Sequence, residues 1–201
     1  MAEQTEVEGE VGEQAHVDVE AAKPGVRIGI LTISDRASRG EMEDLSGPAI
    51  QKAVAKSKLI VAVYACIPDD RKLISRTLRR WADEDLCDCI LTTGGTGLSA
   101  RDVTPESTLR ILDQTLPHLS TYIALQGVKS APTAILSRGI AGARGRTLIV
   151  NLPGSPDGAA TGARIVAGVA THAVAVLRGD AAHTPAAAPA KASENGAHAD
   201  L

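Results

Sequence analysis

The chain has 201 residues, with 21 Lys and Arg against 24 Asp and Glu, so its formal net charge is only −3. It contains no Phe, two Tyr and one Trp, which argues against a protein that stacks single-stranded nucleic acid on aromatic side chains along a basic groove. No apolar run approaches the roughly 18 residues that span a bilayer, since Arg164 and His172 interrupt the apolar C-terminal segment. We therefore expect neither a nucleic acid nor a membrane among its partners.

The two ends of the chain differ in composition from its middle. Residues 1–24 are acidic and poor in large apolar side chains, and residues 180–201 consist mainly of small and polar residues with several Ala and Pro. Such segments cannot bury enough apolar surface to offset the entropy of ordering, so we predict two disordered tails. Residues 25–179 have the size of one ordinary domain and are predicted to fold as one.

The first half of this domain alternates apolar strands with helical patterns. Strands are predicted at residues 26–33, 59–67 and 89–93, and helices at 47–56 and 71–83. The helix at 71–83 combines an apolar stripe with a basic face, which we interpret as a solvated face; its cations are Arg71, Lys72, Arg76, Arg79 and Arg80. The β-α-β-α-β-α order predicts an α/β fold with a parallel, largely buried sheet and helices on both faces.

The second half of the domain is less regular. We predict a helix from Pro105 to about Leu116, and two strands, at residues 134–137 and 146–150, around the Gly-rich segment 139–145. A long helix rich in small residues is predicted at 156–177.

The three cysteines are Cys66, Cys87 and Cys89. An odd count without a leader sequence predicts reduced thiols and a cytoplasmic protein. The Cys87-Asp88-Cys89 spacing is too short for a zinc pair, so we interpret it as the entry to a strand.

Residues 91–106 carry the densest set of chemical signals. Three glycines, Gly94, Gly95 and Gly97, surround Thr96 after a strand, and such a backbone can turn successive N–H groups toward an anion. Asp102 follows as a carboxylate that can hold the metal ion accompanying a polyphosphate. Thr104 and Pro105 are typical of an N-cap and a first helical residue. The segment lacks both the Walker Lys and the dinucleotide-binding glycine spacing.

Polar motifs also follow the other predicted strands. Because the carboxyl ends of parallel strands meet at one edge of a sheet, we expect these motifs to converge on one anion-binding crevice. They are Ser34-Asp35, Asp69-Asp70, Gly94–Gly97 with Asp102, and Asn151–Pro156. Each motif alone has a simpler interpretation: a helix cap at Asp69-Asp70, tight turns at Gly94-Gly95 and at Asn151–Gly154, and an ordinary strand end at Ser137-Arg138.

Together these motifs resemble one known family. Ile33–Gly40, Ile67–Asp70, Thr93–Gly97, Arg101–Glu106, Leu136–Arg138 and Asn151–Gly154 are similar, in this order, to the molybdopterin adenylyltransferases of molybdenum cofactor biosynthesis. This family includes bacterial Mog/MoaB-type proteins and the G domains of plant and animal relatives such as gephyrin.

The resemblance implies a three-layer α/β/α domain, usually a homotrimer. It also implies a Mg²⁺-dependent reaction in which the terminal phosphate of molybdopterin attacks the α-phosphorus of ATP and pyrophosphate leaves. By the same resemblance, Asp69 and Asp102 are the catalytic and metal-binding carboxylates. The implied nucleotide and substrate contacts are Ser34, Asp35, Gly94, Gly95, Thr96, Gly97, Ser137, Arg138, Asn151, Pro153 and Gly154.

The chain departs from the family pattern between Thr115 and Gly127. Thr115-Leu116-Pro117-His118 stands where the family commonly has Glu-x-Pro-Gly, and residues 123–127 lack the Met-Arg-x-x-Ser of many bacterial members. A phosphate contact would then shift to Arg138 or Lys129. Two alternatives stay open: a non-catalytic trimeric protein that binds and delivers molybdopterin, and a different nucleotidyltransferase on the same fold. The molybdenum insertase of the same pathway is a candidate partner.

Overall fold

The computed structural model describes residues 25–180. The predicted disordered tails lie outside the described residues, apart from Asp180, whose N–H donates to the carbonyl of Ala175. The described part is a six-stranded sheet in the order β2-β1-β3-β6-β5-β4 with helices on both faces. The predicted three-layer α/β fold is therefore confirmed.

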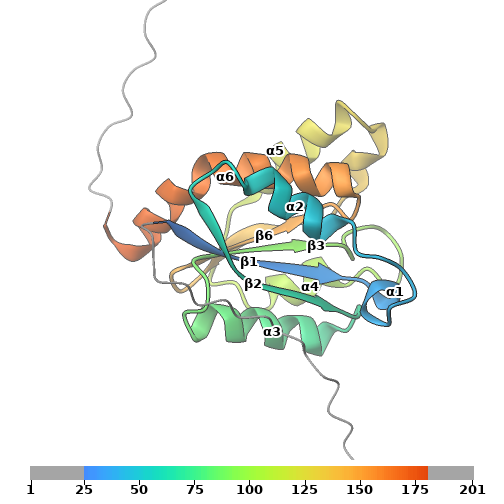
Figure 1. Ribbon diagram of the computed structural model, residues 1–201, viewed down its shortest axis with the longest axis horizontal. Helices are drawn as coiled ribbons and strands as arrows, with labels where there is room; N and C mark the ends of the chain where they lie inside the picture. Colours follow the sequence, from blue (N-terminus) through green and yellow to red (C-terminus); the bar gives the residue numbers. More distant parts are fainter. Residues whose placement is uncertain (1–24, 181–201) are drawn as a thin grey trace, which may run out of the picture.

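Four strands run parallel in the body of the sheet. They are β1 (Val26–Ile33), β2 (Leu59–Ile67), β3 (Cys89–Thr93) and β6 (Thr147–Leu152). The predictions for the first three were correct at both ends. Figure 1 shows the arrowheads of β1, β2 and β3 at the same edge, and the strand ends are in register, with Ile33 beside Ile67 and Thr93 beside Leu152. The loops that follow these strands consequently share one side of the domain.

The helices cover the two faces of the sheet. On one face lie α2 (Ser46–Val54), α5 (Pro117–Val128) and α6 (Pro156–Arg178), and on the other α3 (Arg71–Asp83) and α4 (Thr104–Leu109). Successive side chains of β1 point to opposite faces of the sheet, so this strand contributes to the apolar core on both faces. Ile28 and Ile30 pack with α2 and α6, whereas Leu31 and Ile33 pack with α3.

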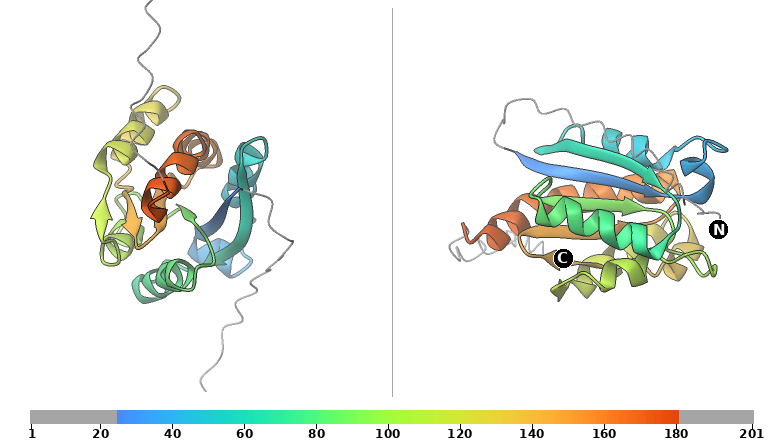
Figure 2. Two further views of the ribbon diagram at one scale, coloured as in Figure 1. Left: turned by 90° about the vertical axis from the view of Figure 1, so that its left-hand side faces the viewer. Right: turned by 90° about the horizontal axis from the view of Figure 1, so that it is seen from below.

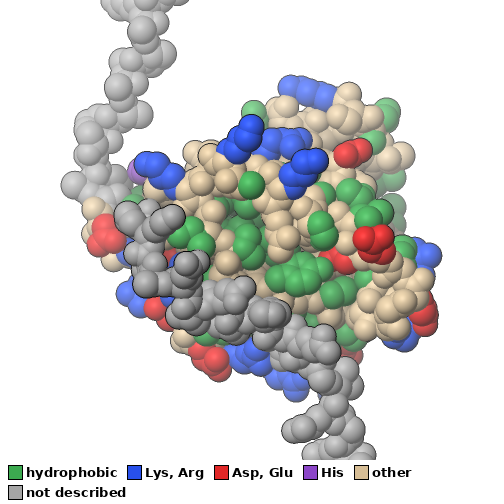
Figure 3. All heavy atoms as spheres, viewed as in Figure 1, with side chains coloured by type: hydrophobic (Ala, Val, Ile, Leu, Met, Phe, Trp, Pro, Cys, Tyr) green, Lys and Arg blue, Asp and Glu red, His purple; other side chains and the backbone are tan. Residues whose placement is uncertain are grey.

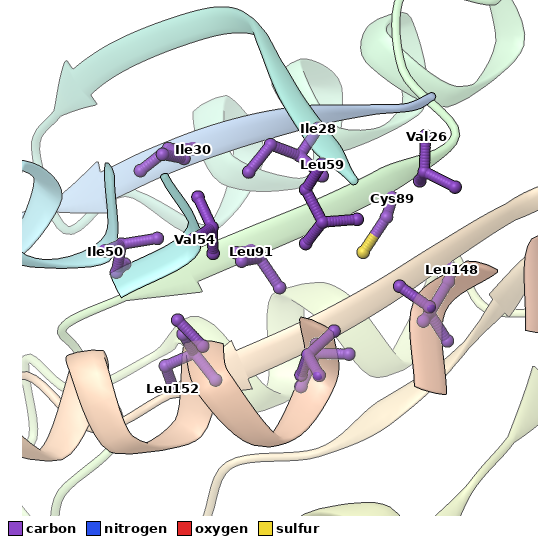
Figure 4. Packing of buried hydrophobic residues seen from close by; sticks show 14 of the residues in the cluster. Val26, Ile28, Ile30, Ile50, Val54, Leu59, Cys89, Leu91, Leu148 and Leu152 are labelled. Carbon is purple, nitrogen blue, oxygen red and sulfur yellow. The ribbon is translucent and has the colours of Figure 1, made fainter. Parts of the chain in front are cut away.

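The cysteines are structural. Cys89 points into the apolar cluster beneath α2 and α6, beside Leu91 and Leu148 (Figure 4). Burial raises the pKa of Cys66 to about 11 and that of Cys87 to about 12, so these thiols stay protonated. The interpretation of Cys87–Cys89 as a strand entry is correct.

Helix α3 places its cations in solvent. Ile74, Leu78 and Trp81 are fully buried against the sheet, while Arg71, Lys72, Arg76 and Arg79 are exposed. In Figure 3, Lys and Arg side chains gather at the lower edge, where Figure 1 places this helix. The solvated basic face predicted from the sequence is present.

The region between β3 and β6 was predicted less well. The predicted helix 105–116 ends at Leu109, and the chain continues into the short strand β4 (Gln114–Thr115) and then into α5, which was missed. Pro117 occupies the first turn of α5, and only Ile123 of that helix is buried, so the segment carries little helical periodicity.

Two further predictions in this region were wrong. Residues 134–137, predicted as a strand, belong mostly to a 3-10 helix, η1 (Pro132–Leu136). The Gly-rich segment contains a strand, β5 (Ala141–Arg144), which pairs antiparallel with β6 and β4. Gly142 is required there, since a Cβ at this position would lie 2.3 Å from the carbonyl oxygen of Gln114.

Helix α6 is long and apolar enough to cross a membrane by length and composition alone, contrary to the expectation from the sequence. Six of its residues are buried, along one stripe that packs on the sheet; they are Ala159, Gly162, Ala163, Val166, Ala170 and Val174. Its role in the core accounts for its apolar composition.

Candidate active site

A pocket of about 740 Å³ opens at the carboxyl ends of β1, β2 and β3. Seven of the residues expected at the site line it: Ser34, Asp35, Asp69, Gly94, Gly95, Asp102 and Gly154. The expectation that the loops after the parallel strands meet in one crevice is therefore correct.

Two aspartates hold the ends of β1 and β2 together. The N–H of Asp35 donates to Oδ2 of Asp69 at 3.0 Å, and the N–H of Asp69 donates to Oδ1 of Asp35 at 3.1 Å. The neighbouring Asp70 is the N-cap of α3 and accepts from the N–H of Leu73 at 2.7 Å. The simple cap interpretation thus holds for Asp70, while Asp69 faces the pocket.

The glycine loop depends on conformations that other residues rarely adopt. Gly94 and Gly95 have φ values of 95° and 61°. A Cβ at Gly94 would lie 2.2 Å from the carbonyl oxygen of Ile33, and one at Gly95 would lie 2.4 Å from Oγ1 of Thr104. Thr104 is the first residue of α4 and not its N-cap as predicted, because its hydroxyl donates to the carbonyl of Gly94 instead.

Asp102 lies against the same loop. Its Oδ2 accepts from the N–H of Ser99 at 2.8 Å and lies 2.9 Å from the position of a Cβ on Gly97. Oδ1 of Asp69 lies 2.8 Å from the position of a Cβ on Gly95. Both carboxylates therefore border the glycines from the pocket side.

The pocket carries more negative charge than it compensates. Arg101 forms an ion pair with Asp35 at 2.7 Å, and this hydrogen-bonded pair lowers the pKa of Asp35. Burial raises the pKa of Asp69, and the nearby charges of Asp35 and Asp102 raise it further. Such a site favours an arriving cation.

Four of the expected contacts do not line the pocket. They are Thr96, Gly97, Ser137 and Arg138; Arg138 instead donates to the main-chain carbonyls of Gly97 and Asp102 and pairs with Glu106. The hydroxyl of Ser137 lies 3.4 Å from that of Thr96.

Asn151 and Pro153, also expected as substrate contacts, do not line the pocket either. Asn151 belongs to β6, is 2% exposed, and uses its amide to donate to the hydroxyls of Thr92 and Thr108. Pro153 lies outside the pocket lining, and its carbonyl accepts from Thr93 Oγ1 at 2.7 Å. Of the motif Asn151–Pro156, Gly154 and Pro156 line the pocket, while Asn151 and Pro153 bond to other parts of the fold.

The sequence missed one wall of the pocket. This wall is the connection from α1 (Asp35–Ser38) to α2, and its lining residues are Arg39, Met42, Glu43, Asp44, Leu45 and Ser46. Asp44 accepts from the N–H groups of Ser46 and Gly47 and from the hydroxyl of Tyr64. The one signal in the sequence was an acid two residues ahead of a helix start, which any helix cap would also give.

Within residues 25–180, no three His, Cys, Asp or Glu side chains are grouped as a metal-binding cluster. Mg²⁺ commonly takes one or two carboxylates plus substrate phosphates, so a pair such as Asp69 and Asp102 suits a metal that arrives with its substrate.

The fold and the pocket define an α/β protein with a carboxylate- and glycine-lined pocket at the carboxyl edge of a parallel sheet. A family model described as a probable molybdopterin binding domain matches residues 29–172, and the chain belongs to this family. The family membership inferred from the motifs is confirmed.

Individual relatives agree with this membership. A molybdopterin adenylyltransferase of Helicobacter pylori is 45% identical over 133 residues, covering 65% of this chain and 76% of the relative. The molybdenum cofactor synthesis protein cinnamon of Drosophila melanogaster is 38% identical over 77% of this chain and 26% of its own length. The crystal structure of the molybdopterin biosynthesis enzyme MoaB of Thermus thermophilus has a TM-score of 0.72 and 47% identity, covering 77% of this chain and 97% of MoaB. The relatives named as adenylyltransferases belong to the predicted enzyme class, the nucleotidyltransferases.

Proposed function

We propose that this protein is a cytoplasmic molybdopterin adenylyltransferase that joins molybdopterin and ATP into adenylyl-molybdopterin and releases pyrophosphate. The observation that carries the proposal is that Asp69 and Asp102 both line the pocket and lie against the Gly94–Gly97 loop. Family membership and relatives that bear this name support it.

The reaction depends on positioning the two substrates more than on proton transfer. An oxygen of the molybdopterin phosphate forms a bond to the α-phosphorus of ATP, and the bond from that phosphorus to the oxygen bridging to the β-phosphorus breaks. The attacking oxygen is already anionic, so no general base is needed. The pocket lining contains no His. The protein's task is to hold two anionic substrates in line and to compensate their charge.

The carboxylates suit the Mg²⁺ that accompanies ATP. Asp69 and Asp102 would hold it, while Asp35 stays engaged with Arg101. Held there with the nucleotide, Mg²⁺ would compensate negative charge on the phosphates, including the pyrophosphate that leaves. The N–H groups of the Gly94–Gly97 loop would receive the phosphates.

A second candidate is a protein that binds and delivers molybdopterin without catalysis. The altered segment Thr115–Gly127 favours it, because residues 123–127 lack the Met-Arg-x-x-Ser of many bacterial members. The pair Asp69 and Asp102 argues for the enzyme, since a carrier of an anionic pterin gains nothing from two carboxylates.

We further propose a homotrimer that hands its product to the molybdenum insertase of the same pathway. Exposed apolar side chains on and around α5 and η1 would supply a subunit contact; they are Leu116, Tyr122, Leu125, Ile135 and Leu136. Sedimentation equilibrium tests the assembly: we expect three times the chain mass, and a monomer at all concentrations would contradict it.

Incubation with molybdopterin, ATP and Mg²⁺ tests the function. We expect pyrophosphate and adenylyl-molybdopterin in equal amounts, and none of either when Mg²⁺ is chelated. Binding of molybdopterin without product formation would instead establish the carrier.

A further inference from the structure

Arg138 is bound to both ends of the loop that carries Asp102. Its Nε donates to the carbonyl of Gly97 at 2.7 Å, and its Nη2 donates to the carbonyl of Asp102 at 2.7 Å. Its own N–H donates to the carbonyl of Thr96 at 2.8 Å. Arg138 thus ties the main chain of Gly97 to the main chain of Asp102, five residues further along the sequence.

The remaining nitrogen of the Arg138 guanidinium, Nη1, is bound by Glu106. Nη1 of Arg138 forms an ion pair with Oε1 of Glu106, in the first turn of α4. The other carboxylate oxygen of Glu106 is buried and has no hydrogen-bond partner among the described residues. The charge of Arg138 is therefore already compensated, and its planar fork is directed at main-chain carbonyls rather than at the pocket.

We propose that Arg138 is a positioning residue, which fixes the loop from Gly97 to Asp102 so that the Asp102 carboxylate stays beside the phosphate-receiving glycines. The proposal rests on the adenylyl-transfer function and reassigns Arg138, which the sequence had indicated as a substrate contact. Arg138 acts through the main chain, because it donates a hydrogen bond to the carbonyl of Asp102. The carboxylate of Asp102 is oriented separately, by a hydrogen bond that it accepts from the N–H of Ser99.

The alternative, a direct contact from Arg138 to a substrate phosphate, requires the Glu106 pair and both carbonyl bonds to be given up. Arg101 is better placed for such a contact, because it lines the pocket and is 65% exposed, with only Asp35 as its ion-pair partner among the described residues.

The test compares Arg138→Ala, Arg138→Lys and Glu106→Gln with the wild-type full chain. The matched control is Arg144→Ala, because Arg144 likewise binds an acid, Asp83, and a carbonyl, that of Ile111, but lies away from the pocket. Two readouts are taken: amide hydrogen exchange over residues 96–103, which needs no turnover, and steady-state kinetics at varied molybdopterin and Mg²⁺.

We expect the loop amides of Arg138→Ala to exchange roughly tenfold faster or more, the change implied by losing one charge-assisted hydrogen bond. We expect kcat to fall roughly 100-fold, as for a reacting group displaced by about 1 Å, with little change in KM for molybdopterin and a higher Mg²⁺ requirement. Arg138→Lys should recover part of both effects, Glu106→Gln should show a weaker form of them, and Arg144→Ala should show neither.

Unchanged loop exchange, or a raised KM for molybdopterin with kcat retained, would overturn the positioning role and make Arg138 a substrate contact. Absence of turnover in the wild type, together with faster loop exchange in Arg138→Ala, would instead refute the adenylyl transfer. It would still support the role of Arg138 in fixing the loop from Gly97 to Asp102.

Discussion

Asp35 and Asp69 each accept a hydrogen bond from the other's main-chain N–H, at 3.0 and 3.1 Å. This reciprocal pair joins the ends of β1 and β2 at the pocket and brings two carboxylates close together. Arg101 forms an ion pair with the carboxylate of Asp35. The carboxylate of Asp69 has no such partner in the described part of the chain, and its Oδ1 lies 2.8 Å from the position of a Cβ on Gly95. The arrangement has a cost in electrostatic repulsion, which a bound cation would relieve.

The first prediction concerns pH. Burial, together with the charges of Asp35 and Asp102, raises the pKa of Asp69 above its usual value. Mg²⁺ binds the ionised form, so its affinity is full at high pH and is lost as the pH falls through this raised pKa. Mg²⁺ titrations with a non-hydrolysable ATP analogue should lose affinity at a pH above the usual Asp value of about 3.9. Affinity that persists down to that value would show Asp69 to be uninvolved, and Asp69→Asn should abolish the dependence.

The second prediction concerns the glycine loop. Gly94→Ala places a Cβ 2.2 Å from the carbonyl oxygen of Ile33 at a φ of 95°. We expect a loss of about 3 kcal/mol or more in the free energy of unfolding, from backbone strain and the clash together. Urea unfolding measures it.

Gly40 provides the matched control for this loop. Its φ is 71°, but a Cβ there meets nothing within 4 Å, so Gly40→Ala should cost only about 1 kcal/mol of left-handed strain. Equal losses at Gly40 and Gly94 would mean that close packing against Ile33 contributes nothing.

The third prediction concerns Asp88, at the opposite end of the sheet. Its side chain is 3% exposed and pairs with Arg27 at 2.8 Å and Arg178 at 2.6 Å. Burial alone would raise the pKa of Asp88, but the hydrogen bonds from Arg27 and Arg178 outweigh it and lower the pKa. These two ion pairs therefore stabilise the fold fully at pH values above the unfolded-state pKa of about 3.9. Their contribution is lost as the pH falls through the lowered folded-state pKa of Asp88.

Asp88→Asn should reduce the free energy of unfolding at neutral pH by about 2–3 kcal/mol, less than for a fully buried pair because both guanidiniums reach solvent. Urea unfolding at neutral and acidic pH should show the gap between variant and wild type closing in acid. Glu41→Gln, which breaks an exposed pair with Arg39, should leave stability unchanged. A constant gap at all pH values would refute the assignment to Asp88.

The sequence predicted the parallel half of the fold well because its strands are runs of mostly apolar residues, which are buried on both faces in β1 and β3. The strands from Val26, Leu59 and Cys89, and the helix from Arg71, all carry period or composition signals that tertiary contacts do not override. The antiparallel edge was lost because β4 has two residues and β5 consists of Ala, Gly, Ala and Arg, which have low strand propensity. Only the pairing of β5 with β6, and of β4 with β5, makes them strands.

The positions that line the pocket could be predicted where they closely follow a parallel strand, as Asp35, Asp69 and Gly94 do. The sequence did not show that Asn151 turns inward within β6, or that Arg138 is held by Glu106, 32 residues away. The pocket wall at Asp44 depends on Tyr64, 20 residues away, and has no local signature.

Asp102 is central to the proposed reaction, and its role is tested most directly by measuring pyrophosphate release and molybdopterin binding together in the wild type, Asp102→Asn and Asp70→Ser. Asp70→Ser is the control, since it keeps a cap acceptor for α3 outside the pocket. We predict that Asp102→Asn lowers turnover by roughly 100-fold or more with the fold and pterin binding retained, while Asp70→Ser turns over as the wild type does. Near-normal turnover in Asp102→Asn would contradict the catalytic role proposed for Asp102.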